Sequence, residues 1–221
     1  MTKPWTVLVE GSVGAGKSRF LELFRGMKGV EVIPEPVHIW TNYHGANLLG
    51  NAIKDPKEFP LLQLCAYLTQ LKSHLIVKED KPVKIMERSL LSARYCFVEL
   101  VKQAKTNEVA CKLFEEWYDL LVKEIGLHYD SIIYLRTSPI VAYARTQGRG
   151  RREEESLRLD YFEKLNDVHE KWLMAPETAN PLITVIDADR HFTEIENGIE
   201  VRQLKELFAR KDREWNYPLQ Y

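Results

Sequence analysis

Short apolar runs alternate along the chain with longer segments in which apolar residues recur every three or four positions. The short runs are Thr6 to Glu10, Val30 to Ile33, Val83 to Met86, Ser131 to Leu135 and Leu182 to Ile186. Each is apolar enough to be buried on both faces, as the central strands of a parallel sheet are. The alternation predicts an α/β fold with a five-stranded parallel sheet flanked by helices.

Four of the longer segments carry an apolar stripe at helical spacing. The stripes are Phe20, Leu21, Phe24 and Met27; Leu61, Leu64, Leu68, Leu71 and Leu75; Leu113, Trp117 and Leu120; and Phe162, Leu165, Val168 and Trp172. Such stripes are interpreted as core or as subunit contact. The row Leu113, Trp117 and Leu121 suits a contact between two copies of the chain and equally the core of a monomer.

Composition indicates a globular protein with one domain spanning residues 1–221. The chain is 45% hydrophobic and contains 31 basic against 32 acidic residues, so a nucleic-acid polymer is not an expected partner. No apolar run approaches the ~20 residues that span a bilayer, and no presequence pattern opens the chain. We therefore expect no membrane partner and a cytoplasmic location, with a trimmed mitochondrial presequence as the alternative.

The three cysteines are Cys65, Cys96 and Cys111. Their number is odd and no two of them have C-x-x-C spacing, which argues against a disulfide framework or a zinc site. They are predicted to be buried reduced thiols.

A phosphate-binding loop follows the first predicted strand directly. The segment reads Gly11-Ser12-Val13-Gly14-Ala15-Gly16-Lys17-Ser18, a full match to G-x-x-x-x-G-K-[ST] in strand-loop-helix context. Its glycines let successive backbone N–H groups turn toward phosphate oxygens. Lys17 adds a positive charge and the Ser18 hydroxyl suits Mg²⁺, so the loop predicts a site for ATP and Mg²⁺.

Charged residues follow the second and third predicted strands at the edge where open α/β sheets bind ligands. Glu35 lies between two prolines, and Glu87 and Arg88 come directly after Val83 to Met86. A phosphate-binding loop is shared by switches, motors and small kinases. The chain has no base-reading N/T-K-x-D element and is short for a motor, so a small kinase is favoured.

The densest run of charge lies between residues 145 and 155. It contains Arg145, Arg149, Arg151, Glu153 and Glu154, interrupted by two glycines. We interpret it as a mobile segment between two helices.

In combination these motifs resemble the cellular-type deoxyribonucleoside kinase family. The matching segments are Glu10-Gly11 through Ser18, Glu35-Pro36-Val37 with Trp40, Gln63, Glu87-Arg88-Ser89, Ser92 to Glu99, Tyr134-Leu135-Arg136-Thr137, Arg149-x-Arg151-x-Glu153-Glu154, His169-Glu170-x-Trp172-Leu173 and Asp187-Ala188-Asp189. They run over nearly the whole chain. The resemblance implies a P-loop kinase fold, a homodimer and a short arginine-rich lid at about residues 145–155.

The resemblance also implies a role for each residue around the reacting groups. Glu35 would be the general base for a 5′-hydroxyl, with Glu87 as the alternative base and, together with Ser18, the link to the metal. Arg88 would lie near the transferring phosphate, where Lys17 also acts. Further contacts with ATP are implied as well. Arg149 and Arg151 would reach the phosphates, Arg145 would lie beside the adenine, and the adenine pocket would be completed by the backbone of Asp187, Ala188 and Asp189.

The implied acceptor pocket is formed by residues from several segments. Gln63 would bind the edge of the nucleobase, and Trp40 and Phe97 would pack against it. Glu154 would accept a hydrogen bond from the 3′-hydroxyl. Ala93 follows the thymidine-type pattern. Two positions depart from the family: Ile53 stands where a sugar-contacting tyrosine is usual, and Gln70 stands where thymidine-preferring members have methionine.

The prediction is therefore an enzyme that uses ATP to phosphorylate the 5′-hydroxyl of a 2′-deoxyribonucleoside, with thymidine or deoxycytidine preferred. Two alternatives stay open. One is a nucleoside monophosphate kinase of thymidylate type. The other is a regulatory protein that binds ATP without turnover.

Overall fold

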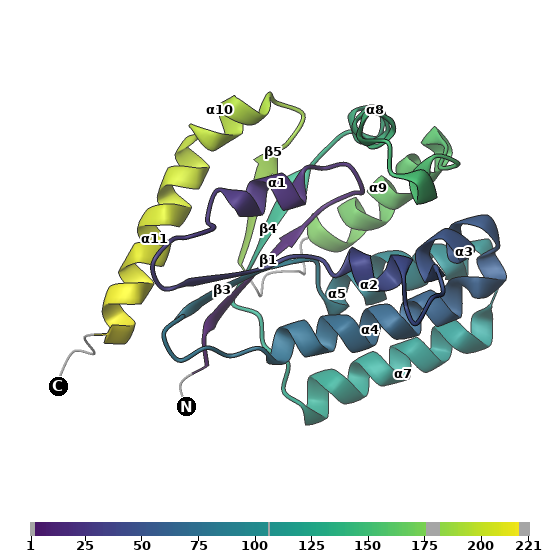
Figure 1. Cartoon of the computed structure of the whole chain (residues 1–221), viewed down its shortest axis with the longest axis horizontal. Coiled ribbons are helices and arrows are strands. Elements are labelled where there is room, and N and C mark those ends of the chain that lie inside the picture. The colour runs from purple at the N-terminus through teal and green to yellow at the C-terminus, as the bar shows by residue number, and fades with distance from the viewer. Residues whose placement is uncertain (1–2, 106, 176–181, 217–221) are drawn as a thin grey trace.

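The computed structural model describes residues 3–105, 107–175 and 182–216. Their centre is a parallel sheet with the order β2-β3-β1-β4-β5 (Figure 1). The strands are β1 (Trp5–Glu10), β2 (Val30–Ile33), β3 (Val83–Glu87), β4 (Ser131–Arg136) and β5 (Leu182–Asp187). All five predicted strands are confirmed, each within one residue of its expected bounds.

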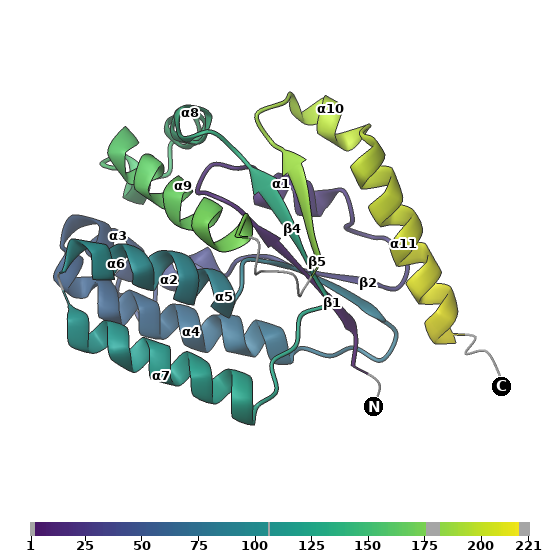
Figure 2. The same cartoon turned by 180° about the vertical axis from the view of Figure 1, so that it is seen from behind.

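Helices connect the strands and cover both faces of the sheet (Figures 1 and 2). They are α1 (Lys17–Glu22), α2 (Val37–Thr41), α3 (Leu48–Lys54), η1 (Pro56–Glu58), α4 (Phe59–Leu75), α5 (Leu90–Ser92), the π-helical turn η2 (Ala93–Val98), α6 (Glu99–Ala104), α7 (Glu108–Glu124), α8 (Pro139–Arg149), η3 (Arg152–Glu154), α9 (Leu159–Leu173), α10 (Phe192–Glu196) and α11 (Ile199–Asn216). Among the described residues, no helix is both long enough and apolar enough to cross a bilayer.

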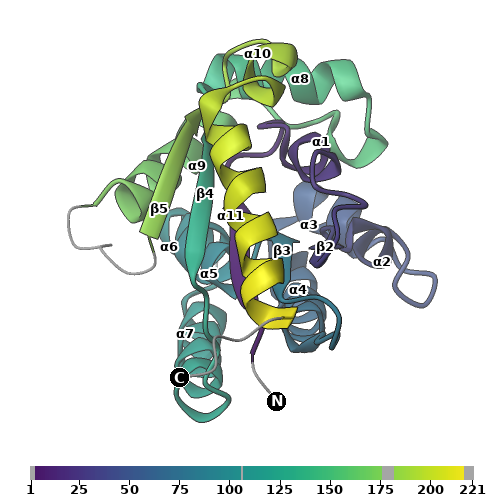
Figure 3. The same ribbon diagram turned by 90° about the vertical axis from the view of Figure 1, so that its left-hand side faces the viewer.

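Side chains of the strands alternate between two apolar layers, as the period of two requires. Val7 and Val9 pack with Phe24 and Phe208 under α1 and α11, where α11 lies along the sheet (Figure 3). Leu8 points the other way, into the layer under α4, α5, α7 and α9. The sheet is thus buried on both faces, which explains why its strands read as continuous apolar runs.

Two of the four helical stripes belong to the core. The stripe on α9 is buried throughout, and on the first stripe Phe20, Leu21 and Phe24 are buried while Met27 packs at the edge. The three cysteines are also confirmed as free and buried.

The stripes on α4 and α7 are largely exposed in the single chain. The exposed side chains are Leu61, Leu64, Leu68 and Leu75 on α4 and Val109, Leu113, Trp117 and Leu120 on α7. The prediction that Leu121 shares a row with Leu113 and Trp117 is wrong, because Leu121 faces inward and is 4% exposed. Leu120 takes its place on the outer face.

The predicted lid is only partly a loop. Helix α8 continues through Arg145 to Arg149, and Gly150 ends it in a left-handed conformation with φ 66°. Beyond it, η3 leads into α9. The first half of the charged run is therefore helical, because Arg145 and Arg149 are good helix formers and Gly148 is tolerated inside the last turn.

Candidate active site

The phosphate-binding loop leaves β1 at Glu10 and leads into α1 at Lys17. Gly11 has φ 146°, and a Cβ at this position would stand 2.6 Å from the Leu135 carbonyl oxygen of β4. Gly14 and Gly16 also have positive φ values. Side chains at Gly11 and Gly14 would meet the carbonyl oxygens of Leu135 on β4 and Ala142 on α8, so these two glycines allow the loop to lie close to both elements.

Lys17 lies inside this loop. Its Nζ donates hydrogen bonds to the carbonyl oxygens of Gly11, at 3.2 Å, and Ser12, at 2.8 Å. Burial lowers the pKa of Lys17 to about 8, and the nearby Arg88 lowers it further, against the opposing effect of Glu35. At pH 7 the side chain still carries its charge, held by two neutral acceptors and free to bind an anion.

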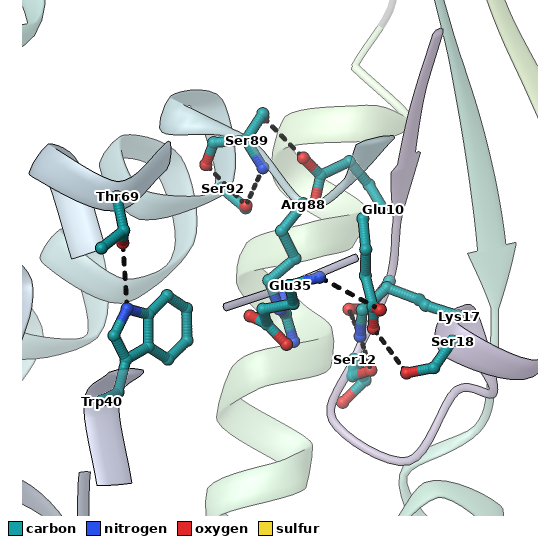
Figure 4. Close-up of polar contacts among 12 residues, drawn as sticks. Glu10, Ser12, Lys17, Ser18, Glu35, Trp40, Thr69, Arg88, Ser89 and Ser92 are labelled. Carbon is teal, nitrogen blue, oxygen red and sulfur yellow. Dashed lines mark hydrogen bonds and ion pairs between the residues drawn. The ribbon is translucent and has the colours of Figure 1, made fainter. Parts of the chain in front are cut away.

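Glu87 connects the phosphate-binding loop to the end of β2 through hydrogen bonds. Its carboxylate accepts from the Ser18 hydroxyl at 2.9 Å and from the Glu35 backbone N–H at 3.4 Å (Figure 4). A serine hydroxyl and a carboxylate in contact are the hard oxygen donors that Mg²⁺ prefers. Since the described residues contain no group of three or more His, Cys, Asp or Glu able to hold a metal, an ion here would take its other ligands from water and phosphate.

Arg88 faces Glu35 across the site. The Arg88 Nε lies 2.9 Å from a Glu35 carboxylate oxygen, and the guanidinium stands over the Phe97 ring, 4.9 Å from its centroid. Burial and the Glu87 charge raise the pKa of Glu35, while Arg88 and Lys17 oppose them; burial is the largest effect. A carboxylate whose pKa is moved toward neutrality is suited to accept a proton near pH 7.

A cavity of about 920 Å³ opens between these strand ends and the helices. Of the residues expected around ATP, its lining includes Gly14, Gly16, Lys17, Ser18, Arg145 and Arg149. Of those expected around the acceptor, it includes Glu35, Trp40, Gln63, Gln70, Glu87, Arg88, Ala93, Phe97, Arg151 and Glu154. Residues from six separate segments of the sequence therefore meet around one space.

The acceptor end of the cavity is lined mainly by α4 and η2. Gln63 is buried, and its Nε2 donates to the Ala93 carbonyl oxygen at 3.1 Å, which leaves the amide oxygen and one N–H for a ligand. Gln70 lines the same space two helical turns further along α4. The Trp40 indole N–H donates to the Thr69 hydroxyl at 3.0 Å, which holds the Trp40 ring at the wall.

The lid residues pair with one another. Arg149 and Arg151 both form ion pairs with Glu154, the second at 2.6 Å. A phosphate or a sugar hydroxyl that bound to these side chains would replace these pairs. The Asn47 amide, which also caps α3, donates to Glu153 at 2.7 Å and so connects the lid to α3.

The expected adenine contacts come together at the end of β5. Arg145 of α8 donates to the carbonyl oxygens of Ala188, at 2.7 Å, and Arg190, at 3.4 Å. The Asp189 carboxylate accepts from the Ser138 N–H at 2.9 Å. These bonds join α8 to the loop after β5, the loop whose backbone the sequence analysis assigned to adenine.

Several cavity-lining residues were not predicted from the sequence, among them Tyr161 and Leu49. Tyr161 of α9 lines the cavity with Glu154, and burial raises its pKa to about 12. Leu49 lines it beside Ile53, the position where the family usually has tyrosine. Tyr43, the tyrosine that precedes Ile53 in the sequence, is not among the lining residues. Only the fold reveals Tyr161, since its spacing in the sequence resembles that of any other helical residue.

Known proteins resemble this chain over most of its length. The deoxynucleoside kinase family model matches residues 7–208. Mitochondrial thymidine kinase 2 of Homo sapiens is 39% identical over 194 residues, covering 86% of this chain and 72% of that protein. Deoxycytidine kinase of Homo sapiens is 31% identical, covering 76% and 75%. Mitochondrial deoxyguanosine kinase of Xenopus laevis is 32% identical, covering 77% and 73%.

Proposed function

This chain belongs to the deoxynucleoside kinase family, and from that premise we propose that it transfers the γ-phosphate of ATP to the 5′-hydroxyl of a 2′-deoxyribonucleoside. The observation that carries the proposal is the Arg88–Glu35 pair, 2.9 Å apart, in the same cavity as Lys17 and the base-reading candidate Gln63. The residues proposed for the donor site, the base and the acceptor pocket thus line one space.

The donor side supplies charge for phosphoryl transfer. This reaction needs positioning and neutralisation of the negative charge that spreads over the phosphoryl oxygens. Lys17, Arg88, Arg149 and Arg151 provide the positive side chains, the last two after leaving Glu154. Mg²⁺, held by Ser18 and Glu87, would neutralise phosphate charge when bound.

On the acceptor side, Glu35 is the proposed general base. Both carboxylates line the cavity, but the Glu35 side chain is 14% exposed and pairs with Arg88, while Glu87 is bonded to Ser18. This division favours Glu35 for the proton of the 5′-hydroxyl and Glu87 for the metal. The proton passes from the hydroxyl oxygen to a Glu35 carboxylate oxygen as that oxygen bonds to the γ-phosphorus of ATP, while the bond from this phosphorus to the β,γ-bridging oxygen breaks and ADP leaves.

A pyrimidine is the proposed base, since Gln63 offers an acceptor and a donor, and Ala93 leaves room beside them. Steady-state assays with ATP and each of the four deoxyribonucleosides test this function. Turnover of thymidine and deoxycytidine supports it. Phosphorylation of thymidine monophosphate but not thymidine would favour the thymidylate-type alternative, and ATP binding without any turnover would favour the regulatory one.

Gln70→Met should raise kcat/KM for thymidine relative to deoxycytidine by about tenfold, equivalent to roughly 1.4 kcal/mol. Gln70 lines the cavity and is 3% exposed, and its amide is more polar than a thioether beside a thymine methyl group. Parallel assays of both nucleosides with both proteins measure the ratio. Lys72→Met, a change at an exposed position on the same helix, is the control. An unchanged ratio in Gln70→Met would mean that Gln70 does not influence the choice between the two nucleosides.

The proposed assembly is a homodimer built on α4 and α7. These helices pack together through Tyr67 and Phe114, whose ring centroids are 5.3 Å apart. The exposed apolar rows described above lie on the same two helices. Leaving so much apolar surface in water is unfavourable, and a second copy of the chain would bury it on both sides of a two-fold axis.

Trp117→Asp is expected to convert the protein from a dimer to a monomer. Trp117 is 53% exposed at the middle of α7, and a charge there would be buried without a partner in the dimer. Light scattering after gel filtration should give twice the 25.8 kDa chain mass for the original protein and once that mass for the variant. Ile199→Asp, at an exposed apolar position on α11, should leave the dimer intact; a monomeric original protein contradicts the proposal.

The cytoplasmic location expected from the sequence stays a prediction. Two of the three relatives named above are mitochondrial by name. Immunofluorescence of the tagged protein in its own cells would distinguish the two compartments.

A further inference from the structure

Arg88 has an unusual backbone for an arginine. Its φ is 61°, in the left-handed region that residues with a Cβ seldom adopt. Its side chain is only 3% exposed, and its N–H donates to the Val9 carbonyl oxygen at 3.0 Å. A strained conformation persists only where its surroundings hold it, so some neighbouring groups must maintain this turn.

The groups that hold the turn come from Glu10 and the two serines that follow Arg88. The Ser89 hydroxyl donates to a Glu10 carboxyl oxygen at 2.6 Å (Figure 4) and accepts from the Leu91 N–H at 3.1 Å. The Ser92 hydroxyl accepts from the Ser89 N–H at 3.2 Å and donates to the Ser89 carbonyl oxygen at 3.0 Å. Every polar group of Ser89 is thereby bonded, and the anchor of this arrangement on β1 is Glu10.

Glu10 is also electrostatically linked to Arg88. It is completely buried at the end of β1, and burial raises its pKa to about 7, an effect that Arg88 opposes more than any other group. Glu10 Oε2 and Arg88 Nη1 are buried atoms without a hydrogen-bond partner, although Glu10 Oε1 and Arg88 Nε are bonded. Glu10 and Glu35 thus both act on the same guanidinium, from β1 and from the end of β2.

We propose that Glu10 is a positioning residue that, through Ser89, holds the left-handed turn directing the Arg88 guanidinium toward Glu35 and the transferring phosphate. The inference rests on the proposed kinase function, because the phosphate is the group that Arg88 would serve. Glu10 itself contacts no substrate. It acts only through Ser89 and Arg88.

Two variants test the connection at different points. Ser89→Ala removes the hydroxyl and keeps the Glu10 carboxyl, whereas Glu10→Gln keeps an acceptor for Ser89 and removes the negative charge. Each should lower kcat by about tenfold or more and leave both KM values within about threefold, because ground-state binding does not need the Arg88 orientation. Ser131→Ala, at a buried serine on β4, and Glu31→Gln, at an ion-paired glutamate on β2, are the matched controls and should retain full kcat.

The Arg88→Lys background separates positioning from stability. Lysine has no planar guanidinium to orient, so adding Glu10→Gln or Ser89→Ala to Arg88→Lys should lower kcat by less than about twofold. Equal losses in both backgrounds would overturn the proposal, since they would reflect a general weakening of the fold. Thermal unfolding of every variant measures that weakening directly.

A second measurement does not depend on activity. The Arg88 Nε–H, bonded to Glu35 in a buried site, should give a resolved ¹⁵N–¹H resonance that Arg88→Lys removes and thereby assigns. Ser89→Ala and Glu10→Gln should shift this resonance or broaden it. An unmoved resonance overturns the proposal, whereas absent turnover in the original protein with a shifted resonance overturns only the kinase function.

Discussion

Lys17→Met is expected to lower phosphoryl transfer by at least about 10²–10³-fold while the fold stays intact. The Nζ of Lys17 is bonded only to the carbonyl oxygens of Gly11 and Ser12, so no buried carboxylate loses its partner when the charge is removed. Methionine is unbranched and fills the space that the lysine side chain occupied. The loop backbone would still surround the phosphates, but the movable charge on them would be gone.

Single-turnover and steady-state assays with ATP and thymidine measure this effect, and circular dichroism with thermal unfolding checks the fold. Lys28→Met, at a side chain that is 86% exposed, is the matched control and should keep full activity. Turnover of Lys17→Met at the original rate would mean that this loop is not the donor site.

Glu35→Gln should lower kcat by roughly 10² or more, with a smaller effect on nucleoside affinity. Glutamine has the shape of glutamate and can still accept from Arg88, but it cannot take the proton of a 5′-hydroxyl. Glu31→Gln, on the strand that leads to Glu35, is the matched control because Glu31 pairs with Lys78 outside the cavity.

The pH dependence of kcat gives a second test of the same residue. The pKa of Glu35 is raised, mainly by burial, so its carboxylate form is lost on acidification at a higher pH than for an ordinary glutamate. The original protein should therefore lose activity as pH falls through that raised pKa. The residual activity of Glu35→Gln should show no such loss over the same pH range. If Glu35→Gln stays active while Glu87→Gln is inactive, Glu87 is the base and the assignment proposed above is reversed.

Much of the donor site was predictable because its signals are local. The phosphate-binding loop follows a strand and precedes a helix, and its glycines have the positive φ values that the motif implies. Glu35, Glu87 and Arg88 follow strands whose carboxyl ends meet at one sheet edge, so their proximity follows from a parallel sheet alone. The 2.9 Å Arg88–Glu35 contact agrees with that expectation.

The helical stripes show where periodicity stops being informative. Leu64 on α4 and Leu165 on α9 stand in stripes with the same spacing, yet the first is 55% exposed and the second is fully buried. The spacing indicates that residues share one face of a helix. Whether that face packs against the core or faces solvent depends on the neighbouring elements. Leu121 was misassigned for the same reason.

Local patterns were enough to predict the α/β class, the strand positions, the phosphate-binding loop and the charged strand ends, because each depends on residues that are close along the chain. The bond from the Ser89 hydroxyl to Glu10, the place of Tyr161 in the cavity lining and the pairing of the lid arginines with Glu154 became visible only in the folded chain. Glu10 and Ser89 are 79 positions apart, and their contact at 2.6 Å exists because β1 and β3 are neighbours in the sheet. Contacts of this kind depend on strand order and register, which local patterns do not specify.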